Sequence, residues 1–205
     1  MARAIEQLTE HKADLCVVGA VDSLLESTFL HALLAEGRLK TGQSSSGLIP
    51  GEGAAALVLE RTEDALRRQA WPLAVVDAIS LEQDAPHQPH APIRAEGPTR
   101  ALRTVLEVAG AGGIRRVMND LNGERWRFLE WALAETRCLD GLPRGWQLWH
   151  PADCLGDVGA AFGLVAVALA TRAFARGYHG DGKVLIAACS ERGERAAMCL
   201  SAPTR

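Results

Sequence analysis

Apolar and polar residues alternate along the chain in two patterns, short apolar runs of strand length and longer segments with helical spacing. Up to residue 84 the pattern predicts three strands separated by helices and one polar loop. In chain order these are a helix over Ala4–Lys12, a strand at 13–23, an irregular helix over Leu24–Leu39, a loop at 41–47, a strand over Ala54–Glu60, a helix from Thr62 and a strand at 72–84. The strand at 13–23, ADLCVVGAVDS, is apolar at successive positions, which predicts burial on both faces.

The stretch APHQPHAPIRAEGP at 85–98 is rich in Pro and His and predicts a loop that connects two halves. Beyond it, strands and helices alternate and a hairpin closes the chain. In order we expect a helix over Thr99–Ala109, a strand at 114–120, a helix at 124–137, a strand at 146–151, a helix over Val158–Arg176 and the hairpin at 183–202. This order is typical of an α/β fold with a mostly parallel sheet and a closing antiparallel strand.

Composition narrows the class of protein. The 205 residues are 48% hydrophobic and carry a net charge of -3 without a Lys/Arg cluster, so we expect neither nucleic-acid nor membrane-surface binding. The longest apolar run, AAFGLVAVALA, is too short to span a bilayer, and the N-terminus lacks the apolar core of a signal peptide. The expected location is the cytoplasm.

Cysteine and histidine residues give no metal signature. The five cysteines include no C-x-x-C pair, and Cys16, Cys189 and Cys199 lie in strand-like runs, which predicts buried reduced thiols. His87 and His90 lack acidic or thiol neighbours and predict a solvated loop. We therefore expect neither a metal nor another cofactor.

Polar residues gather at two entries to helices. Asp120, Asn122 and Glu124 follow a predicted parallel strand, so they form either a structural turn or part of a site at the carboxyl edge of the sheet. Asp157 lies in GDVGAA before the longest apolar helix, where it either binds backbone N–H groups or takes part in chemistry.

Four further positions could supply a nucleophile or line the same pocket. His150 and Cys154 are four residues apart in HPADC and could form a Cys–His pair if both face one cavity. Pro151 lies between them and interrupts a helix, so the spacing alone does not bring them together. Cys189 and Ser190 end a predicted strand and are candidates of the same kind.

Three segments resemble the β-ketoacyl synthases of the thiolase superfamily. They are ADLCVVGAVDSL with the later GLIPGEGAAALVLER, the run MNDLNGERWRFLEWAL, and GDVGAAFGLVAVALA. The resemblance implies a thiolase-like layered α/β/α fold and covers the part of the family that follows its nucleophile. Residues 1–84 would end the N-terminal half, 85–98 would connect the halves, and 99–205 would form the C-terminal half.

The family's catalytic residues are not retained. By the resemblance, the nucleophilic Cys would precede this chain, the first catalytic His falls at or near Asn122, the second on Asp157, and the catalytic Lys on Ala152. The Gly-rich turn of the last hairpin is replaced by residues 190–194. Carboxylates at such a site disfavour an enolate, because an ionised Asp accepts hydrogen bonds and cannot donate them.

The resemblance therefore implies a non-condensing ketosynthase-like protein of fatty-acid or polyketide-type biosynthesis, similar to a chain-length factor or accessory subunit. It would work with an acyl carrier protein or a ketosynthase partner, as a homo- or heterodimer paired through the strand DLCVVGAV. Two alternatives stay open. One is an acyltransferase with an altered mechanism that uses Asp120, Asn122, Glu124, Asp157 and His150, and the other is the C-terminal part of an active synthase.

Overall fold

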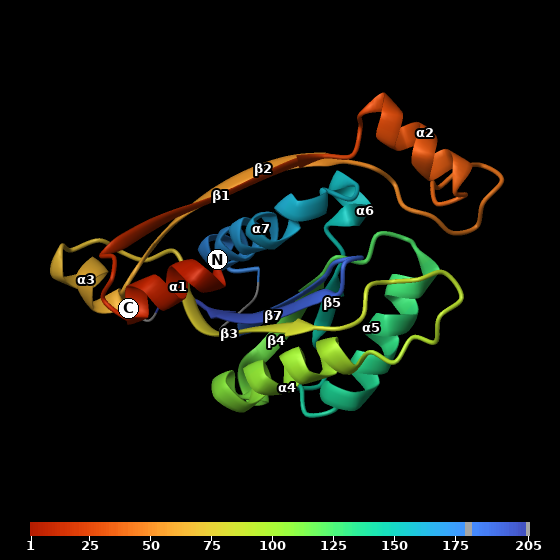
Figure 1. The fold of residues 1–205 in the computed structure, drawn as a ribbon. Helices are drawn as coiled ribbons and strands as arrows, with labels where there is room; N and C mark the ends of the chain where they lie inside the picture. Colours follow the sequence, from red (N-terminus) through yellow and green to blue (C-terminus); the bar gives the residue numbers. More distant parts are fainter. Residues whose placement is uncertain (179–181, 204–205) are drawn as a thin grey trace.

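A computed structural model describes residues 1–178 and 182–203, and in that part of the chain helices and strands alternate (Figure 1). The helices are α1 (Ala2–Thr9), α2 (Ser27–Ala35), α3 (Thr62–Arg67), α4 (Glu96–Ala109), α5 (Arg125–Cys138), α6 (Ala152–Leu155) and α7 (Phe162–Arg176), with 3₁₀ turns at Ala111–Gly113 and Gly159–Ala161. The strands are β1 (Leu15–Ser23), β2 (Glu52–Glu60), β3 (Val75–Gln83), β4 (Ile114–Asn119), β5 (Gln147–Trp149), β6 (Lys183–Cys189) and β7 (Glu194–Ser201).

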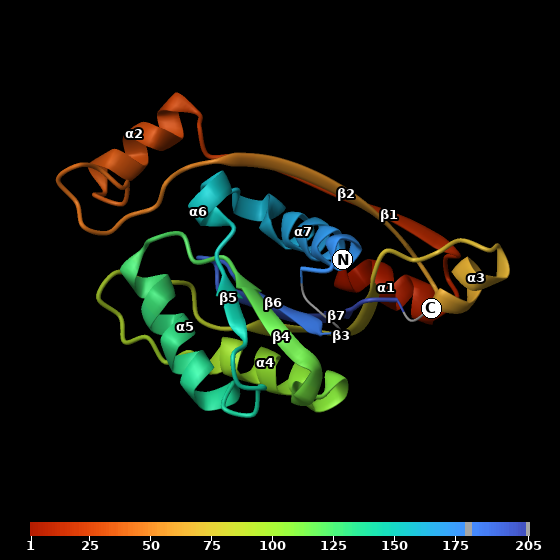
Figure 2. The ribbon, with the colours of Figure 1, turned by 180° about the vertical axis from the view of Figure 1, so that it is seen from behind.

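These elements stack in layers. The pair β1–β2 forms one layer, α7 lies beneath it, a five-stranded sheet follows, and α4 and α5 cover the far face of that sheet (Figures 1 and 2). One core fills the space between the sheet and α4 and α5, with Val105, Val117 and Trp131 among its members. A second core lies between the sheet and α7 and includes Phe162 and Val184. The predicted layered α/β fold is confirmed.

The five-stranded sheet has the order β3-β7-β6-β4-β5. Strand β4 runs parallel to β5 and β6, whereas β6–β7 and β3–β7 are antiparallel. These pairings give β3, β4, β5 and β6 the same direction and β7 the opposite one, so the expected mostly parallel sheet with a closing antiparallel strand is confirmed. The change from one sheet to the other therefore lies between β2 and β3 and does not coincide with the connecting loop at 85–98.

Strand β1 is covered on one face only, so the expected burial on both faces is wrong. Alternate residues point inward, and Ala20 packs against the core around α7. The other residues point outward, where the side chains of Val17 and Val21 are 71% and 78% exposed.

Two predicted helices have different ends in the structure. The irregular helix expected over Leu24–Leu39 is reduced to α2. Helix α4 begins at Glu96, three residues before the expected start, because both carboxylate oxygens of Asp84 accept the Gly97 N–H at 2.9 and 3.0 Å. Asp84 directly follows β3, 13 residues before Gly97, where the local pattern does not indicate the contact.

The segment Gly159–Arg176 is long and apolar enough to cross a membrane by length and composition, with a mean hydropathy of 1.3 over 18 residues. The run AAFGLVAVALA, expected to be too short to span a bilayer, is only part of this segment, which also contains Arg172 and Arg176. In the fold the segment lies between two sheets, and Phe162, Ala166 and Ala170 are buried in the core. Burial inside the protein accounts for its apolar character.

Candidate functional site

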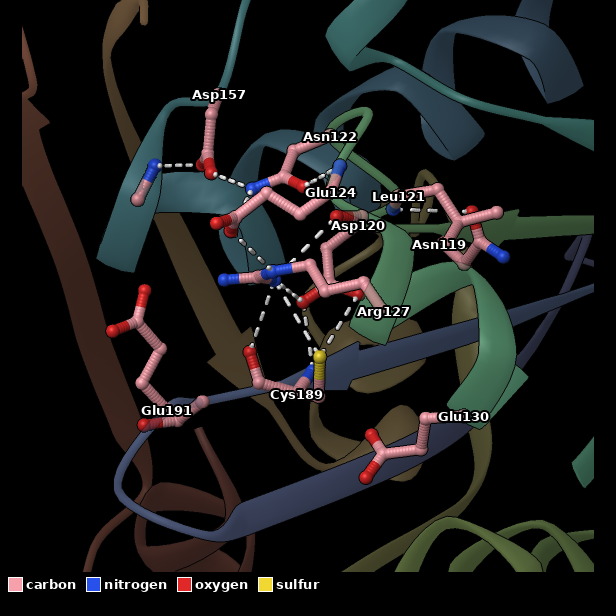
Figure 3. Close-up of polar contacts among 12 residues, drawn as sticks. Asn119, Asp120, Leu121, Asn122, Glu124, Arg127, Glu130, Asp157, Cys189 and Glu191 are labelled. Carbon is pink, nitrogen blue, oxygen red and sulfur yellow. Dashed lines mark hydrogen bonds and ion pairs between the residues drawn. The ribbon is translucent and has the colours of Figure 1, made fainter. Parts of the chain in front are cut away.

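Four polar residues from distant segments meet at one edge of the five-stranded sheet (Figure 3). Asp120 follows β4, Glu124 precedes α5, Asp157 precedes the entry to α7, and Cys189 ends β6. Since β4 and β6 are parallel, their carboxyl ends lie at the same edge, where sites of open α/β sheets occur. The sheet thus brings the predicted candidates on both helix entries together.

Asn122 and Asp157 are bound to each other. The Asn122 Nδ2 group donates to Asp157 Oδ2 at 2.6 Å and to Glu124 Oε2 at 3.3 Å, and Asn122 Oδ1 accepts the Glu124 N–H at 3.1 Å. The second carboxylate oxygen of Asp157 accepts the Gly159 N–H at 2.8 Å. The two hydrogens of the Asn122 amide group are therefore both used by carboxylates.

Glu124 is held by an arginine from a distant segment. Arg38, in the loop after α2, donates to its two carboxylate oxygens at 2.7 and 3.1 Å and also binds Glu191 in the β6–β7 turn. Burial alone would raise the pKa of Glu124, but the hydrogen bonds and charge of Arg38 outweigh it, so the pKa lies below its usual value. The hydrogen bonding of Arg38 to Glu124 is the largest of the effects that raise the pKa of Arg38. Glu124 is thus a buried carboxylate that stays ionised.

Asp120 and Cys189 share a second arginine. Arg127 Nη1 lies 2.8 Å from Asp120 Oδ2 and 3.5 Å from Cys189 Sγ, and the same Asp120 oxygen accepts the Cys189 N–H at 2.7 Å. Burial raises the pKa of Asp120, and burial together with the Asp120 charge raises the pKa of the Cys189 thiol well above its usual value. At neutral pH this thiol is protonated and is a weak nucleophile.

The remaining candidates do not join this cluster. No hydrogen bond between described residues connects His150 with Cys154; Cys154 is exposed on α6, while His150 lines a cleft of about 520 Å³ with Glu124 and Asp153. Ser190 has a structural place in the β6–β7 turn, where its hydroxyl accepts the Arg192 N–H at 3.1 Å. The proposed Cys–His pair is therefore not formed.

His87 differs from its expected solvated state. Its ring stacks on Trp126 with 4.2 Å between ring centroids, and burial lowers its pKa. Within 1–178 and 182–203, no group of three or more His, Cys, Asp and Glu residues could hold a metal ion. All five cysteines are free, with Cys199 buried and Cys16 and Cys189 half-buried, so the prediction of buried reduced thiols is confirmed in full for Cys199 alone.

Two arginines of the cluster were not predicted. Arg127 lies one helical turn after Glu124, and this spacing could have indicated it. Arg38 lies 86 residues before Glu124, and its position in a polar loop gives no local signal of the contact.

Parts of this sequence are similar to the sequences of known proteins. Residues 1–65 match the family model of the β-ketoacyl synthase N-terminal domain. The chain is also 33% identical over 120 residues to the polyketide biosynthesis malonyl-ACP decarboxylase PksF of Bacillus subtilis strain 168; the match covers 52% of this chain and 28% of PksF.

Solved ketosynthases share the fold over nearly the whole chain. The ketosynthase from module 6 of the bacillaene synthase of Bacillus subtilis 168 superposes with a TM-score of 0.86 at 17% identity, over 99% of this chain and 45% of that one. The ishigamide ketosynthase/chain length factor gives a TM-score of 0.78 at 24% identity, over 98% and 57%. The chain thus spans about half the length of these structures.

Proposed function

This chain has the ketosynthase fold and resembles the β-ketoacyl synthases in sequence, and on this premise we propose that it is a non-condensing ketosynthase-like protein of polyketide or fatty-acid biosynthesis. In this role it would act beside an active ketosynthase and an acyl carrier protein without forming a carbon–carbon bond. The solved ishigamide ketosynthase/chain length factor and the malonyl-ACP in the name of PksF support this class of role.

The hydrogen bond from Asn122 to Asp157 carries the proposal. These two residues stand near the positions that the resemblance assigns to the catalytic His pair, and in the structure they bind each other at 2.6 Å. A condensing site needs free donors directed at the oxygen of the enolate. Here the Asn122 donors are used by two carboxylates, and Asp157 can only accept while it is ionised.

The charge at this edge opposes the same chemistry. Asp157, Glu124 and Asp120 place three carboxyl groups near the place where an enolate oxygen would carry negative charge. Arg38 and Arg127 do not offset this, because each already binds acidic side chains. An enolate would therefore be less stable here than in a site whose hydrogen-bond donors are neutral or cationic.

The thiols near the core are also poor acyl carriers. Burial raises the pKa of Cys199 to about 12 and raises that of Cys189 well above its usual value, which keeps both protonated at neutral pH. Cys199 is in addition inaccessible in β7. Formation of a thioester on either residue would require the site to open.

Purified chain incubated with acetyl-ACP and malonyl-ACP tests the proposal. We expect neither a condensation product nor an acyl adduct by intact-mass spectrometry, and the same result for Asp157→His, which restores one imidazole without a nucleophile. Binding of the acyl carrier protein, measured by biolayer interferometry, is expected in both proteins. A condensation product or an acylated cysteine in the unmodified chain would refute the non-condensing role.

Decarboxylation of malonyl-ACP is the second candidate, and the similarity to PksF favours it. It requires donors to the enolate oxygen but no acyl-enzyme. Carbon dioxide release from malonyl-ACP distinguishes the two roles, with PksF as the positive control. Release above the level of carrier protein alone would establish this second function and would show that the Asn122–Asp157 pair opens to admit substrate.

A further inference from the structure

The outer helical layer of the fold carries a groove lined by arginines. Helices α4 and α5 lie side by side on the face of the five-stranded sheet that points away from α7 (Figures 1 and 2). An open groove of about 730 Å³ runs between them. Its charged lining is four arginines and one glutamate, although the whole chain has a net charge of -3. The lining includes Arg94, Glu96, Arg100, Arg103, Leu133 and Arg137.

The four arginines come from three separate segments. Arg94 lies in the loop before α4, and Arg137 lies in the last turn of α5. Arg100 and Arg103 lie on α4, one helical turn apart. No two of the four are adjacent in the sequence, so the sequence shows no basic cluster. The packing of α4 against α5 creates a positive surface that the order of the residues does not reveal.

The acidic residues of the fold leave part of this positive charge unpaired. Arg100 binds Glu82 at 2.8 Å. Among the described residues, neither Arg103 nor Arg137 has an acidic partner, and Arg137 instead donates to the backbone oxygen of Arg94 at 2.6 Å. Both side chains are exposed, so water solvates their charges and an anionic group of a partner can replace that water.

The charges are spread along the groove. The lining residues of α4 extend from Glu96 to Arg103, which spans about 10 Å along the helix axis. Leu133 and Arg137 line the facing side of α5 and are four residues apart. A single phosphate would contact only part of this length. A helix with carboxylates one turn apart repeats at about 5–6 Å, which matches the spacing of Arg100 and Arg103.

We propose that this groove docks an amphipathic helix of a partner protein that presents an acidic face. Its carboxylates would pair with Arg103 and Arg137, and an apolar side chain would cover Leu133, which is 37% exposed. Opposite charges of this kind steer association and fix the register of the partners. A nucleic acid would extend past the groove over a chain with a net charge of -3, which opposes its binding. The inference does not rest on the proposed function, because neither Asn122 nor Asp157 lines this groove.

A fluorescein-labelled helical peptide with glutamates one turn apart and leucines beside them tests the proposal, with binding to the full chain measured by fluorescence anisotropy. We expect saturable binding that weakens as salt is added. Arg103→Glu should weaken it about fivefold or more, since attraction becomes repulsion at that position. Arg94→Glu, at a side chain that is 77% exposed, should act in the same direction. Arg172→Glu on the exposed side of α7 makes the same change in net charge, is the matched control, and should change binding less than about twofold.

Circular dichroism of the three variants checks that they fold, as expected for substitutions at exposed positions. The same peptide with glutamines in place of glutamates, inorganic phosphate at matched ionic strength, and duplex DNA represent the other occupants. The proposal is overturned if the acidic peptide does not bind, or if the Arg103 and Arg172 variants bind it equally well. It is also overturned if the glutamine peptide binds as tightly, if phosphate displaces the peptide, or if DNA binds more tightly than the peptide.

Discussion

The contact between Arg38 and Glu124 provides a direct test of how the candidate site is held. Arg38→Met keeps most of the aliphatic side chain and removes the two hydrogen bonds of 2.7 and 3.1 Å to the Glu124 carboxylate. Glu124 is 7% exposed, so its charge loses its main partner in a place that water reaches poorly. We expect the variant to fold with reduced stability.

The size of the loss follows from the burial of the pair. Removing one partner of a fully buried ion pair costs about 3–5 kcal/mol, because the other charge stays buried. The Arg38 side chain is 25% exposed, so water can partly replace it. We therefore expect a loss of about 2–3 kcal/mol in the free energy of unfolding, or about 5–10 °C in Tm for a chain of this size.

Urea unfolding followed by circular dichroism measures the loss. The matched control is Arg94→Met, since Arg94 and Glu96 lie 3.9 Å apart and both are largely exposed, and such a pair contributes about 0–1 kcal/mol. A double-mutant cycle with Glu124→Gln isolates the pair. Equal stability of the Arg38 and Arg94 variants, or no coupling in the cycle, would refute the reasoning.

The pH dependence gives an independent check. The pKa of Glu124 is lowered in the folded state, so its stabilising contribution is present above the pKa of an unfolded Glu, about 4.3, and is lost as the pH falls through the folded value. The stability difference between the unmodified chain and Arg38→Met should therefore shrink below about pH 4. A difference that stays constant to pH 3 would show that the charge of Glu124 is not involved.

Three further results are expected. Gly51→Ala should destabilise the fold by about 1–3 kcal/mol in urea unfolding, because the added Cβ would clash with the backbone oxygen of Leu155; an unchanged midpoint would contradict this close approach. Arg195→Met should cost about 3–5 kcal/mol, because Arg195 and Glu130 form a buried pair at 2.7 Å, and Glu130→Gln in the same chain should recover part of it. Iodoacetamide should alkylate the exposed Cys154 in the native state and leave the buried Cys199 unmodified until urea is added, as peptide mass mapping would show; equal labelling would mean that β7 opens.

Much of the fold could be predicted from hydrophobic periodicity. The helix over Val158–Arg176, the hairpin at 183–202 and the helix at 124–137 correspond to α7, β6–β7 and α5 within a few residues. Their patterns are long and bounded by turn residues, so local information suffices. The predicted start of α4 lay three residues too late, because Asp84 binds the Gly97 N–H at the beginning of the helix. Hydrophobic periodicity gives no information about this contact.

The candidate site shows the same division between local and distant information. The local pattern placed Asp120 and Asn122 at the carboxyl edge of a parallel sheet, in either a structural turn or a site, and Asp157 meets Asn122 there. The partner of Glu124 could not be found, because Arg38 reaches it across 86 residues of sequence. The predicted Cys–His pair failed because a four-residue spacing brings two side chains together only on a regular helix, and His150 precedes α6.

The wrong prediction for β1 has a physical origin. Seven consecutive residues from Leu15 to Val21 are apolar or Gly, a pattern typical of strands covered on both faces. Strands with one solvated face alternate apolar and polar residues instead. The sequence of β1 therefore suits an environment with a covering layer on each side, whereas the described fold supplies only one.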